Sequence, residues 1–311
     1  MKAVRIHEYG NTDVLSYEDA PLPEISSTDV LVRVVAASVN PVDWKIREGY
    51  LKQMIAYPFP LTLGWDVSGM IEAVGSDVTG FKVGDAVFSR PDIKRNGTYA
   101  EYVAIRGDEV AHKPKTVSHV EAASLPLAGI TAWEALITAG QLTAHQRILI
   151  HAGSGGVGSL AIQLAKSRGA FVVATTSGRN RAFVKSLGAD EVIDYQEQQF
   201  HEVVKDVDMV FDTLGGEVQE ASWSVLKPGG MLVSIVSPPS EERAKALGMR
   251  SAFVFIEPNA DILTQLSVLA DTGSLRPIVA AEFALEDIAK AHAFSQTGRA
   301  VGKIVLYVGK P

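Results

Sequence analysis

The chain has 311 residues, 47% of them hydrophobic, and its 36 acidic against 29 basic residues give a formal net charge of −7. This length exceeds the size at which a single core usually divides, so two domains are expected. The acidic balance, without a stripe of basic residues, argues against nucleic acid and anionic membranes as partners, and the absence of cysteine excludes disulfides and sulfur-ligated zinc.

Targeting and metal motifs are also missing from the sequence. The seven histidines include no i,i+4 pair, so we predict no metal site. Residues 1–15 show no apolar core followed by a small-residue cleavage site, and no apolar run approaches the ~20 residues of a membrane helix. We therefore expect a cytoplasmic protein.

The first part of the chain, residues 1–121, has short apolar runs separated by turn residues. The runs are β-branched, with Gly and Asp between them, and they cover 29–39, 66–78, 82–89 and 97–105. Such a pattern predicts a mostly antiparallel, barrel-like domain.

From about residue 122 the rhythm changes to buried-type strands that alternate with helical or turn-bearing segments. A helix is predicted to begin at Ser118, because S-H-V-E places Glu121 in capping-box spacing, and to introduce this second part. Parallel neighbours need crossover connections, so the pattern predicts an α/β domain with a six-stranded, doubly wound parallel (Rossmann) sheet. The predicted strands are 147–151, 171–176, 191–195, 208–213, 231–236 and 251–256.

After Pro258 the sequence predicts a helix (261–273), a strand (275–285), a second helix (286–298) and a final strand (303–308). This tail could extend the Rossmann sheet or return to complete the first domain, and the sequence leaves both arrangements open.

A glycine-rich segment follows the strand predicted at 147–151. Gly153, Gly155 and Gly158 have the spacing G-x-G-x-x-G, and apolar residues at helical spacing follow them. The first glycine permits a tight turn, the second lets backbone approach a pyrophosphate, and the third allows close packing of helix on strand. The helix N-terminus would then hold the pyrophosphate. The predicted cofactor loop consists of Gly153, Ser154, Gly155, Gly156, Val157 and Gly158.

The residues after the second predicted strand indicate which dinucleotide binds. An NAD site usually offers a carboxylate about 20 residues past the glycines, but this segment reads TTSGRNR, with Thr176, Ser177 and Arg181 as donors. Hydroxyl and guanidinium groups suit a 2′-phosphate, and Asp190 lies too far along to replace the missing carboxylate. The predicted cofactor is NADPH.

The whole chain resembles the medium-chain dehydrogenases/reductases, and within them the zinc-free quinone oxidoreductases that include the zeta-crystallins. The similar segments are HAGSGGVG, AGITAWEAL, VFDTLGG and GRAVGKIVL. Two further segments, SVNPVDWKIREG and FPLTLGWDVSG, resemble a branch that contains plant alkenal/enone reductases. The resemblance implies a GroES-like catalytic domain formed by 1–121 and 257–311, and a Rossmann domain over 122–256.

The same resemblance implies that the metal of related alcohol dehydrogenases is missing here. Those enzymes place cysteine near Asn40 and Gly-His-Glu where this chain has Gly64, Trp65 and Asp66. Without zinc to polarise an alcohol, the expected reaction is hydride transfer from NADPH to a small electrophilic acceptor, either a quinone or an α,β-unsaturated carbonyl.

Site residues are carried over from the family motif by position. Asn40 and Asp43 match its catalytic Asn and Asp, with the Asn40 amide as the expected donor to the acceptor oxygen, although Asn before Pro41 could simply cap a turn. Thr131 matches a threonine beside the nicotinamide, and Tyr195 a tyrosine beside the 2′-phosphate. The roles of Lys45, Tyr50 and Trp65 stay open, and Lys303 is expected to reach a phosphate or be solvated.

The last strand of the Rossmann sheet, SAFVFI, is long and apolar. Apolar edges are usually covered, and the family resemblance implies a homodimer through this strand. Two alternative functions stay open: an enoyl-thioester reductase, for which a basic patch would be needed, and a non-catalytic NADPH-binding protein of the crystallin type.

Overall fold

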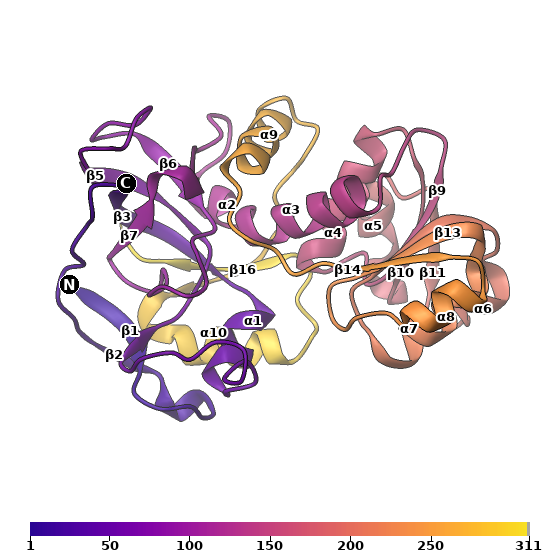
Figure 1. The fold of residues 1–311 in the computed structure, drawn as a ribbon, viewed down its shortest axis with the longest axis horizontal. Helices are drawn as coiled ribbons and strands as arrows, with labels where there is room; N and C mark the ends of the chain where they lie inside the picture. Colours follow the sequence, from indigo (N-terminus) through magenta and orange to yellow (C-terminus); the bar gives the residue numbers. More distant parts are fainter. Residues whose placement is uncertain (310–311) are drawn as a thin grey trace. The chain divides into compact units, whose positions relative to one another are not determined.

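The computed structural model describes residues 1–309, which pack into two compact units. The first unit holds residues 1–127, 257–273 and the described residues from 277 onward, and the second holds 128–256 and 274–276. In Figure 1 the first unit therefore contains both the indigo and the yellow end of the chain. Packing alone does not test independent folding, so the domain bounds expected from the sequence stay a prediction.

The first unit is built mainly from β-strands. Its sheet of seven strands has the order β15-β16-β3-β5-β6-β8, with β7 also paired to β3, and a smaller sheet has the order β2-β1-β4. The larger sheet is antiparallel except for the pair β15–β16, as the short punctuated runs predicted. The strands are β1 (Lys2–Ile6), β2 (Ser16–Asp19), β3 (Asp29–Val39), β4 (Leu61–Thr62), β5 (Val67–Val74), β6 (Ala86–Ser89), β7 (Tyr102–Arg106), β8 (Val110–His112), β15 (Val279–Ala284) and β16 (Lys303–Tyr307).

Strand β3 is the central strand of the larger sheet in this unit. It pairs with β5 along most of its length, with β7 over Asp29–Arg33 and with β16 over Ala36–Val39. β3 is paired on both edges, and 10 of its 11 residues are buried. The pairing with β16 settles the alternatives for the C-terminal tail: it completes the first unit and does not extend the parallel sheet.

Helices of the first unit are few and short. They are α1 (Pro41–Arg47), directly after β3, α2 (His119–Ala123), α9 (Ala260–Asp271) and α10 (Ile288–Gln296). Helix α2 begins where the sequence predicted, since the Ser118 hydroxyl accepts from the Glu121 backbone and the Glu121 carboxylate accepts from the Ser118 backbone. This helix packs on β3 and β5 within the first unit, so it precedes the second unit, which begins at residue 128.

The second unit contains the predicted parallel sheet, in the order β11-β10-β9-β12-β13-β14. Numbered from the glycine-loop strand, this order is 3-2-1-4-5-6, that of a doubly wound dinucleotide-binding fold. The strands are β9 (Arg147–Ile150), β10 (Phe171–Thr176), β11 (Glu191–Asp194), β12 (Val207–Asp212), β13 (Leu226–Ser234) and β14 (Arg250–Phe253).

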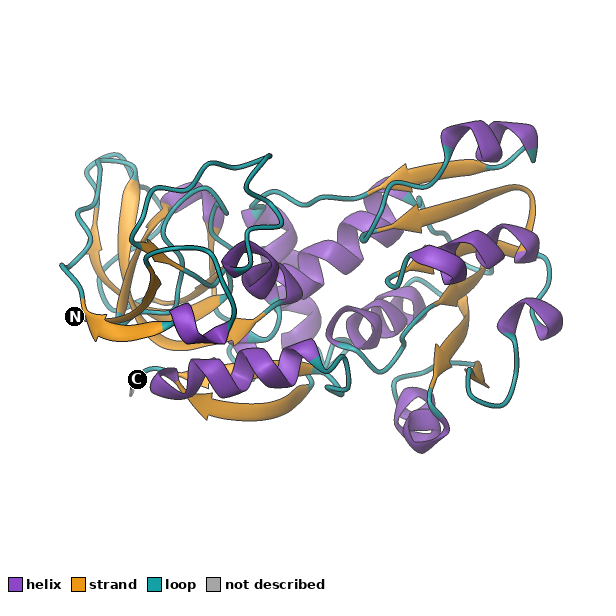
Figure 2. Cartoon of the chain, turned by 90° about the horizontal axis from the view of Figure 1, so that it is seen from below, coloured by secondary structure: helices purple, strands orange, loops and turns teal. Residues whose placement is uncertain are grey.

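Helices alternate with these strands along the chain, whereas strands dominate the part of Figure 2 that holds the two termini. Among residues 1–309 no helix is both long and apolar enough to cross a membrane. The helices here are α3 (Pro126–Trp133), which continues as a π-helical segment (Glu134–Ala139), α4 (Gly156–Ser167), α5 (Arg181–Ser186), α6 (Phe200–Val203), α7 (Gly216–Ser222) and α8 (Glu241–Ala246).

The edge strand β14 is shorter than predicted. The sequence suggested a strand through Ile256, but β14 ends at Phe253, opposite Ser234 at the end of β13. The chain turns directly after β13, where the Ser234 hydroxyl accepts from the backbone of Val236 and Ser237. β14 therefore ends where its partner strand ends, although it lies at the sheet edge as expected.

Candidate active site

The glycine loop lies between β9 and α4, as its sequence context predicted. A Cβ on Gly158 would collide with the Ala152 carbonyl oxygen, and one on Gly153 would meet Ala174 Cβ and Ile162 Cδ1 at 3.0 Å each. These two glycines therefore let α4 lie close to the strands. Gly155 is different, because the nearest atom to an added Cβ is the Ala152 oxygen at 3.3 Å.

The start of α4 offers backbone donors to a ligand. Gly155 is the N-cap residue and, within residues 1–309, no side chain caps this helix end. The first N–H groups of a helix have no intrahelical acceptor, and the helix dipole adds partial positive charge there. A glycine cradle at a 12-residue helix with uncapped donors fits a pyrophosphate.

Hydroxyl groups join the loop to the end of β10. The Thr176 hydroxyl lies 3.0 Å from that of Ser154, and the Asn180 amide donates to the same Ser154 oxygen at 3.2 Å. Behind them, the Thr175 hydroxyl accepts from the Ala152 backbone at 3.2 Å. The structure thus brings together Ser154 and Thr176, which the sequence singled out separately, and adds Asn180, which it missed.

The residues expected beside a 2′-phosphate lie around the ends of β10 and β11. Ser177 is half-buried and Tyr195 is 58% exposed. Arg181 is exposed and donates from Nη2 to the Val192 carbonyl at 3.2 Å. Thr131 is buried on α3.

A buried carboxylate lies at this same sheet edge and was overlooked in the sequence. Asp194 ends β11 opposite Thr176, and a Cβ on Gly178 would collide with its Oδ2. The expectation for NADPH considered only the segment after β10, whereas Asp194 follows the next strand in the motif VIDY. Asp190 was excluded correctly, because it pairs with Lys166 at 2.8 Å and accepts from the Val172 backbone, at the start of the strands.

The first unit holds a second polar centre, built around Asp66. Three groups converge on its Oδ2: the Ser38 hydroxyl at 2.6 Å, the Asn40 amide at 2.8 Å and the Lys303 ammonium at 3.1 Å. The Leu127 backbone donates to Oδ1 at 2.6 Å. Asp66 is fully buried, and these donors compensate a charge that would otherwise be costly to bury.

Lys303 is the cation of this centre. Besides Asp66, its ammonium contacts the Asn40 side-chain oxygen and the Val39 carbonyl, the latter at 3.2 Å. An ammonium has three donors, and all three have acceptors. The expectation that Lys303 reaches a phosphate or is solvated was therefore wrong, because β16 pairs with the end of β3 and carries Lys303 to Asn40.

Asp43 lies next to this centre and holds the start of α1. Its Oδ2 accepts from the Asn40 backbone at 2.7 Å and from the Tyr99 hydroxyl at 2.6 Å. Its Oδ1 is buried without a hydrogen-bond partner in the described residues. Burial raises the pKa of Asp43 to about 7, and burial also raises the pKa of Tyr99, which therefore keeps the proton that it donates.

Asn40 and Asp43 thus lie side by side and both are buried. The other residues left open by the sequence differ in their surroundings: Trp65 is fully buried, Tyr50 is 67% exposed, and the Lys45 ammonium lies 5.7 Å from the Trp44 ring centroid. Over residues 1–309 no cluster of three or more His, Cys, Asp or Glu side chains is arranged to hold a metal ion.

Comparison with known proteins places this chain among oxidoreductases. The Alcohol dehydrogenase GroES-like domain family matches residues 26–115, and the Zinc-binding dehydrogenase family matches residues 187–306. The chain is 35% identical to the NAD(P)H oxidoreductase RTN4IP1, mitochondrial, of Danio rerio over 99% of its own length and 91% of that protein. It is 38% identical to the NADPH-dependent alkenal/one oxidoreductase, chloroplastic, of Arabidopsis thaliana, over 99% of this chain and 79% of that one.

A solved structure agrees with these relatives. The quinone oxidoreductase from Coxiella burnetii has a TM-score of 0.94 and 38% sequence identity, and the match covers 99% of both chains. The likeness therefore extends over both units and over the elements that carry the two polar centres.

Proposed function

The chain belongs to the medium-chain dehydrogenase/reductase family, among its quinone and enone oxidoreductases, and we propose that it transfers hydride from NADPH to a quinone or an α,β-unsaturated carbonyl without zinc. The observation that carries this proposal is the ammonium of Lys303 on Asp66 and Asn40. It gives the catalytic unit a covalently attached cation at the positions where the zinc-dependent relatives hold metal ligands.

The glycine loop and its neighbours would hold the cofactor. Gly153 to Gly158 and the start of α4 would bind the pyrophosphate, and Thr131 would lie beside the nicotinamide. Bound NADPH would supply the hydride, and the chain itself would orient the two reactants.

NADPH is proposed in preference to NADH because Ser177, Arg181 and Tyr195 gather at the end of β10 and β11 with donors for a 2′-phosphate. The buried Asp194 at the same edge is a group that could accept from a ribose hydroxyl, so the preference for NADPH needs a test of its own. Relatives named for NADPH support the proposal.

The use of the donor atoms supports the proposed independence of zinc. Asp66 Oδ2 already accepts from Ser38, Asn40 and Lys303. A metal at this position would have to displace the ammonium and meet its repulsion, at a site without sulfur or imidazole ligands. The acceptor must then be electron-poor through its own conjugation, which describes quinones and enones.

Asn40 and Asp43 would serve the acceptor together. One Asn40 amide N–H goes to Asp66, which leaves the second N–H to donate to an acceptor oxygen. Asp43 fixes the Asn40 backbone at the start of α1, so it would act as a positioning residue for the amide.

Assembly and location are further parts of the proposal. We propose a homodimer in which β14 of two copies pair, because β14 is the sheet edge and Phe253 and Phe255 expose 41% and 45% of their surface. Light scattering at micromolar concentration should give the mass of two chains, and the mass of one would refute it. A cytoplasmic location is also proposed here, although two relatives are described as mitochondrial and chloroplastic.

The test is acceptor-dependent oxidation of NADPH in the presence of EDTA. The panel contains 1,4-benzoquinone, 9,10-phenanthrenequinone, a medium-chain enone and crotonyl-CoA, and the best acceptor is repeated with NADH. Turnover of a quinone or the enone that survives EDTA supports the proposal. A preference for crotonyl-CoA would favour the enoyl-thioester reductase, and NADPH binding without any turnover would favour the non-catalytic protein.

A further inference from the structure

Arg90, directly after β6, is a buried cation without a partner. The residue exposes 2% of its surface, and its Nε and Nη1 are buried with no hydrogen bond from residues 1–309. The third nitrogen, Nη2, also has no hydrogen bond within residues 1–309, but unlike the other two it is not fully shielded from solvent. The guanidinium therefore keeps one edge toward solvent-accessible space.

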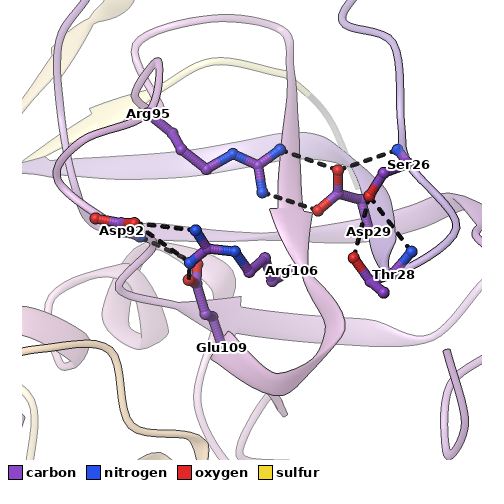
Figure 3. Close-up of polar contacts among 7 residues, drawn as sticks. All are labelled: Ser26, Thr28, Asp29, Asp92, Arg95, Arg106 and Glu109. Carbon is purple, nitrogen blue, oxygen red and sulfur yellow. Dashed lines mark hydrogen bonds and ion pairs between the residues drawn. The ribbon is translucent and has the colours of Figure 1, made fainter.

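The neighbouring arginines of the same unit are paired, and Figure 3 shows how. Arg95 makes two bonds to the Asp29 carboxylate, at 2.8 and 3.0 Å. Arg106 bonds Asp92 at 3.2 Å and also contacts Glu109. Arg90 lies in the same stretch of chain but has no ion pair in the described residues, so its lack of a partner is not a general feature of this region.

The carboxylates whose charge acts on Arg90 are bound to another cation or form no ion pair with it in the described residues. In decreasing order of effect they are Glu257, Asp66, Asp92 and Glu109. Asp92 and Glu109 are held by Arg106, and Asp66 is held by Lys303. Glu257 is exposed and, within residues 1–309, forms no ion pair.

An unpartnered buried guanidinium is costly for the fold. Burial lowers the pKa of Arg90, yet a guanidinium stays charged in proteins. Removing a buried charge that has no partner normally leaves stability unchanged or increases it. Such a residue contributes nothing to the folded state that an apolar side chain could not, but its accessible nitrogen, Nη2, is available to donate to an anion.

Two buried aromatic side chains, Tyr57 and Trp65, lie in the surroundings of Arg90. Its charge acts on the buried hydroxyl of Tyr57, which donates to the Ile93 carbonyl at 2.9 Å. The ring centroid of Tyr57 lies 6.4 Å from that of Trp65, whose indole Nε1 is likewise buried without a hydrogen bond in the described chain. Aromatic rings and unused donors therefore occur together near the start of β5 and the end of β6.

We propose that the Arg90 guanidinium binds the oxygen of the acceptor that becomes negatively charged during reduction. This inference rests on the proposed function. The acceptor gains hydride at a carbon, the electrons of its conjugated π system move onto oxygen, and that oxygen later takes a proton from water. Arg90 stabilises the enolate or hydroquinone anion between these two events and transfers no proton itself.

The test uses a stable mimic of that anion, a nitrophenol that ionises near neutral pH, with the protein free of cofactor. Binding next to a guanidinium favours the phenolate, so its yellow colour should increase when protein is added in slightly acidic buffer. Arg90→Met should weaken phenolate binding about ten-fold or more and leave the melting temperature unchanged or raised. Arg90→Lys should retain part of the binding, because a point charge replaces the planar fork.

Arg95→Met is the matched control. It removes a paired arginine from the same stretch of chain, so it should lower the melting temperature and leave phenolate binding intact. Equal phenolate binding by the wild type and Arg90→Met would overturn the inference, as would a large loss of stability in Arg90→Met without a change in binding.

Kinetics separate this inference from the proposed function. With a working acceptor, kcat/KM of Arg90→Met should fall about a hundred-fold while NADPH affinity is unchanged. If the wild type and Arg90→Met reduce acceptors equally well, the proposed function stands and the role of Arg90 is refuted. If no acceptor is reduced although phenolate binding depends on Arg90, the proposed function fails, and Arg90 binds an anion that is not the product of a reduction by this protein.

Discussion

The glycine loop of the second unit and the Asp66 centre of the first unit both contain groups that stabilise a negative charge, but the chain assembles the two differently. The loop is one continuous segment, and its backbone donors at the start of α4 have no side-chain cap among residues 1–309. The Asp66 centre joins side chains up to 263 residues apart, such as Asn40 and Lys303. One centre presents donors that need a ligand, and the other satisfies its charges internally.

This difference has an energetic consequence. A site that binds a ligand only in the folded state gains stability when the ligand is present, so we expect the loop region to depend on the dinucleotide. The Asp66 centre compensates its buried charges through Lys303, so its integrity should not depend on cofactor. Variants in the two centres should therefore respond differently to added NADPH.

The largest effect is expected from Lys303→Met. The variant leaves Asp66 buried with its cation removed, which should cost about 3–5 kcal/mol of unfolding free energy. Chemical denaturation with and without NADPH measures this loss. NADPH should stabilise the variant no more than it stabilises the wild type. The double variant Lys303→Met/Asp66→Asn is the control and should recover most of the stability, because it removes both charges. If the single variant is as stable as the wild type, the ammonium does not compensate Asp66.

The next effect concerns pH and Asp43. Its pKa rises from 3.8 to about 7 through burial, so the folded state holds a proton that the unfolded chain has released. The stability that Asp43 contributes is fully present at a pH below its pKa in the unfolded chain, and it is lost as the pH rises through its folded-state pKa of about 7. Relative to Asp43→Asn, the wild type should lose up to about 4 kcal/mol between about pH 4 and pH 8.

Asp29 provides the control for that pH dependence. The hydrogen bond from Arg95 lowers the pKa of Asp29 to about 2. The stability that Asp29 contributes is therefore present at a pH above its pKa in the unfolded chain and is lost as the pH falls. Asp29→Asn should therefore change the stability profile at acidic pH with the opposite slope. A pH-independent difference between the wild type and Asp43→Asn would mean that Asp43 is ionised in the folded protein throughout this range.

Gly158→Ala should have a smaller effect on stability and a clear effect on the cofactor. The added Cβ collides with the Ala152 carbonyl, and such overpacking costs about 1–3 kcal/mol. Calorimetry should show weakened NADPH binding, because the start of α4 must shift. Gly155→Ala is the matched variant: its Cβ has 3.3 Å to the nearest atom, so the fold should tolerate it while cofactor affinity still falls. Unchanged affinity in both variants would place the pyrophosphate elsewhere.

The sequence predicted the loop centre much better than the Asp66 centre, and the reason is locality. The six strands of the parallel sheet are continuous apolar runs, and the glycines follow one of them directly, so pattern and spacing sufficed. Lys303 could not be placed because only the pairing of β16 with β3 brings it to Asn40. Arg90 was not singled out for a similar reason, since its lack of a partner depends on where Arg106 and Lys303 direct their own charges.

Within the loop centre, one local rule was applied too narrowly. The expectation for NADPH rested on the residues after β10, and β11 adds Asp194 opposite Thr176. Adjacent parallel strands end at the same sheet edge, so two strand ends must be considered when a cofactor is inferred. Arg181 and Asp194 would favour different groups at the ribose 2′ position.

Arg181→Ala decides between these two residues and is the smallest effect expected. Loss of a charge-assisted bond to the 2′-phosphate should raise the KM for NADPH about ten-fold and leave that for NADH nearly unchanged. Lys185→Ala, on the same helix, is the control, because its ammonium bonds the Asp190 carbonyl. Equal changes for both cofactors would mean that Arg181 supports the edge of β11 through Val192 and does not select the phosphate; Asp194 would then be the group that sets the cofactor preference.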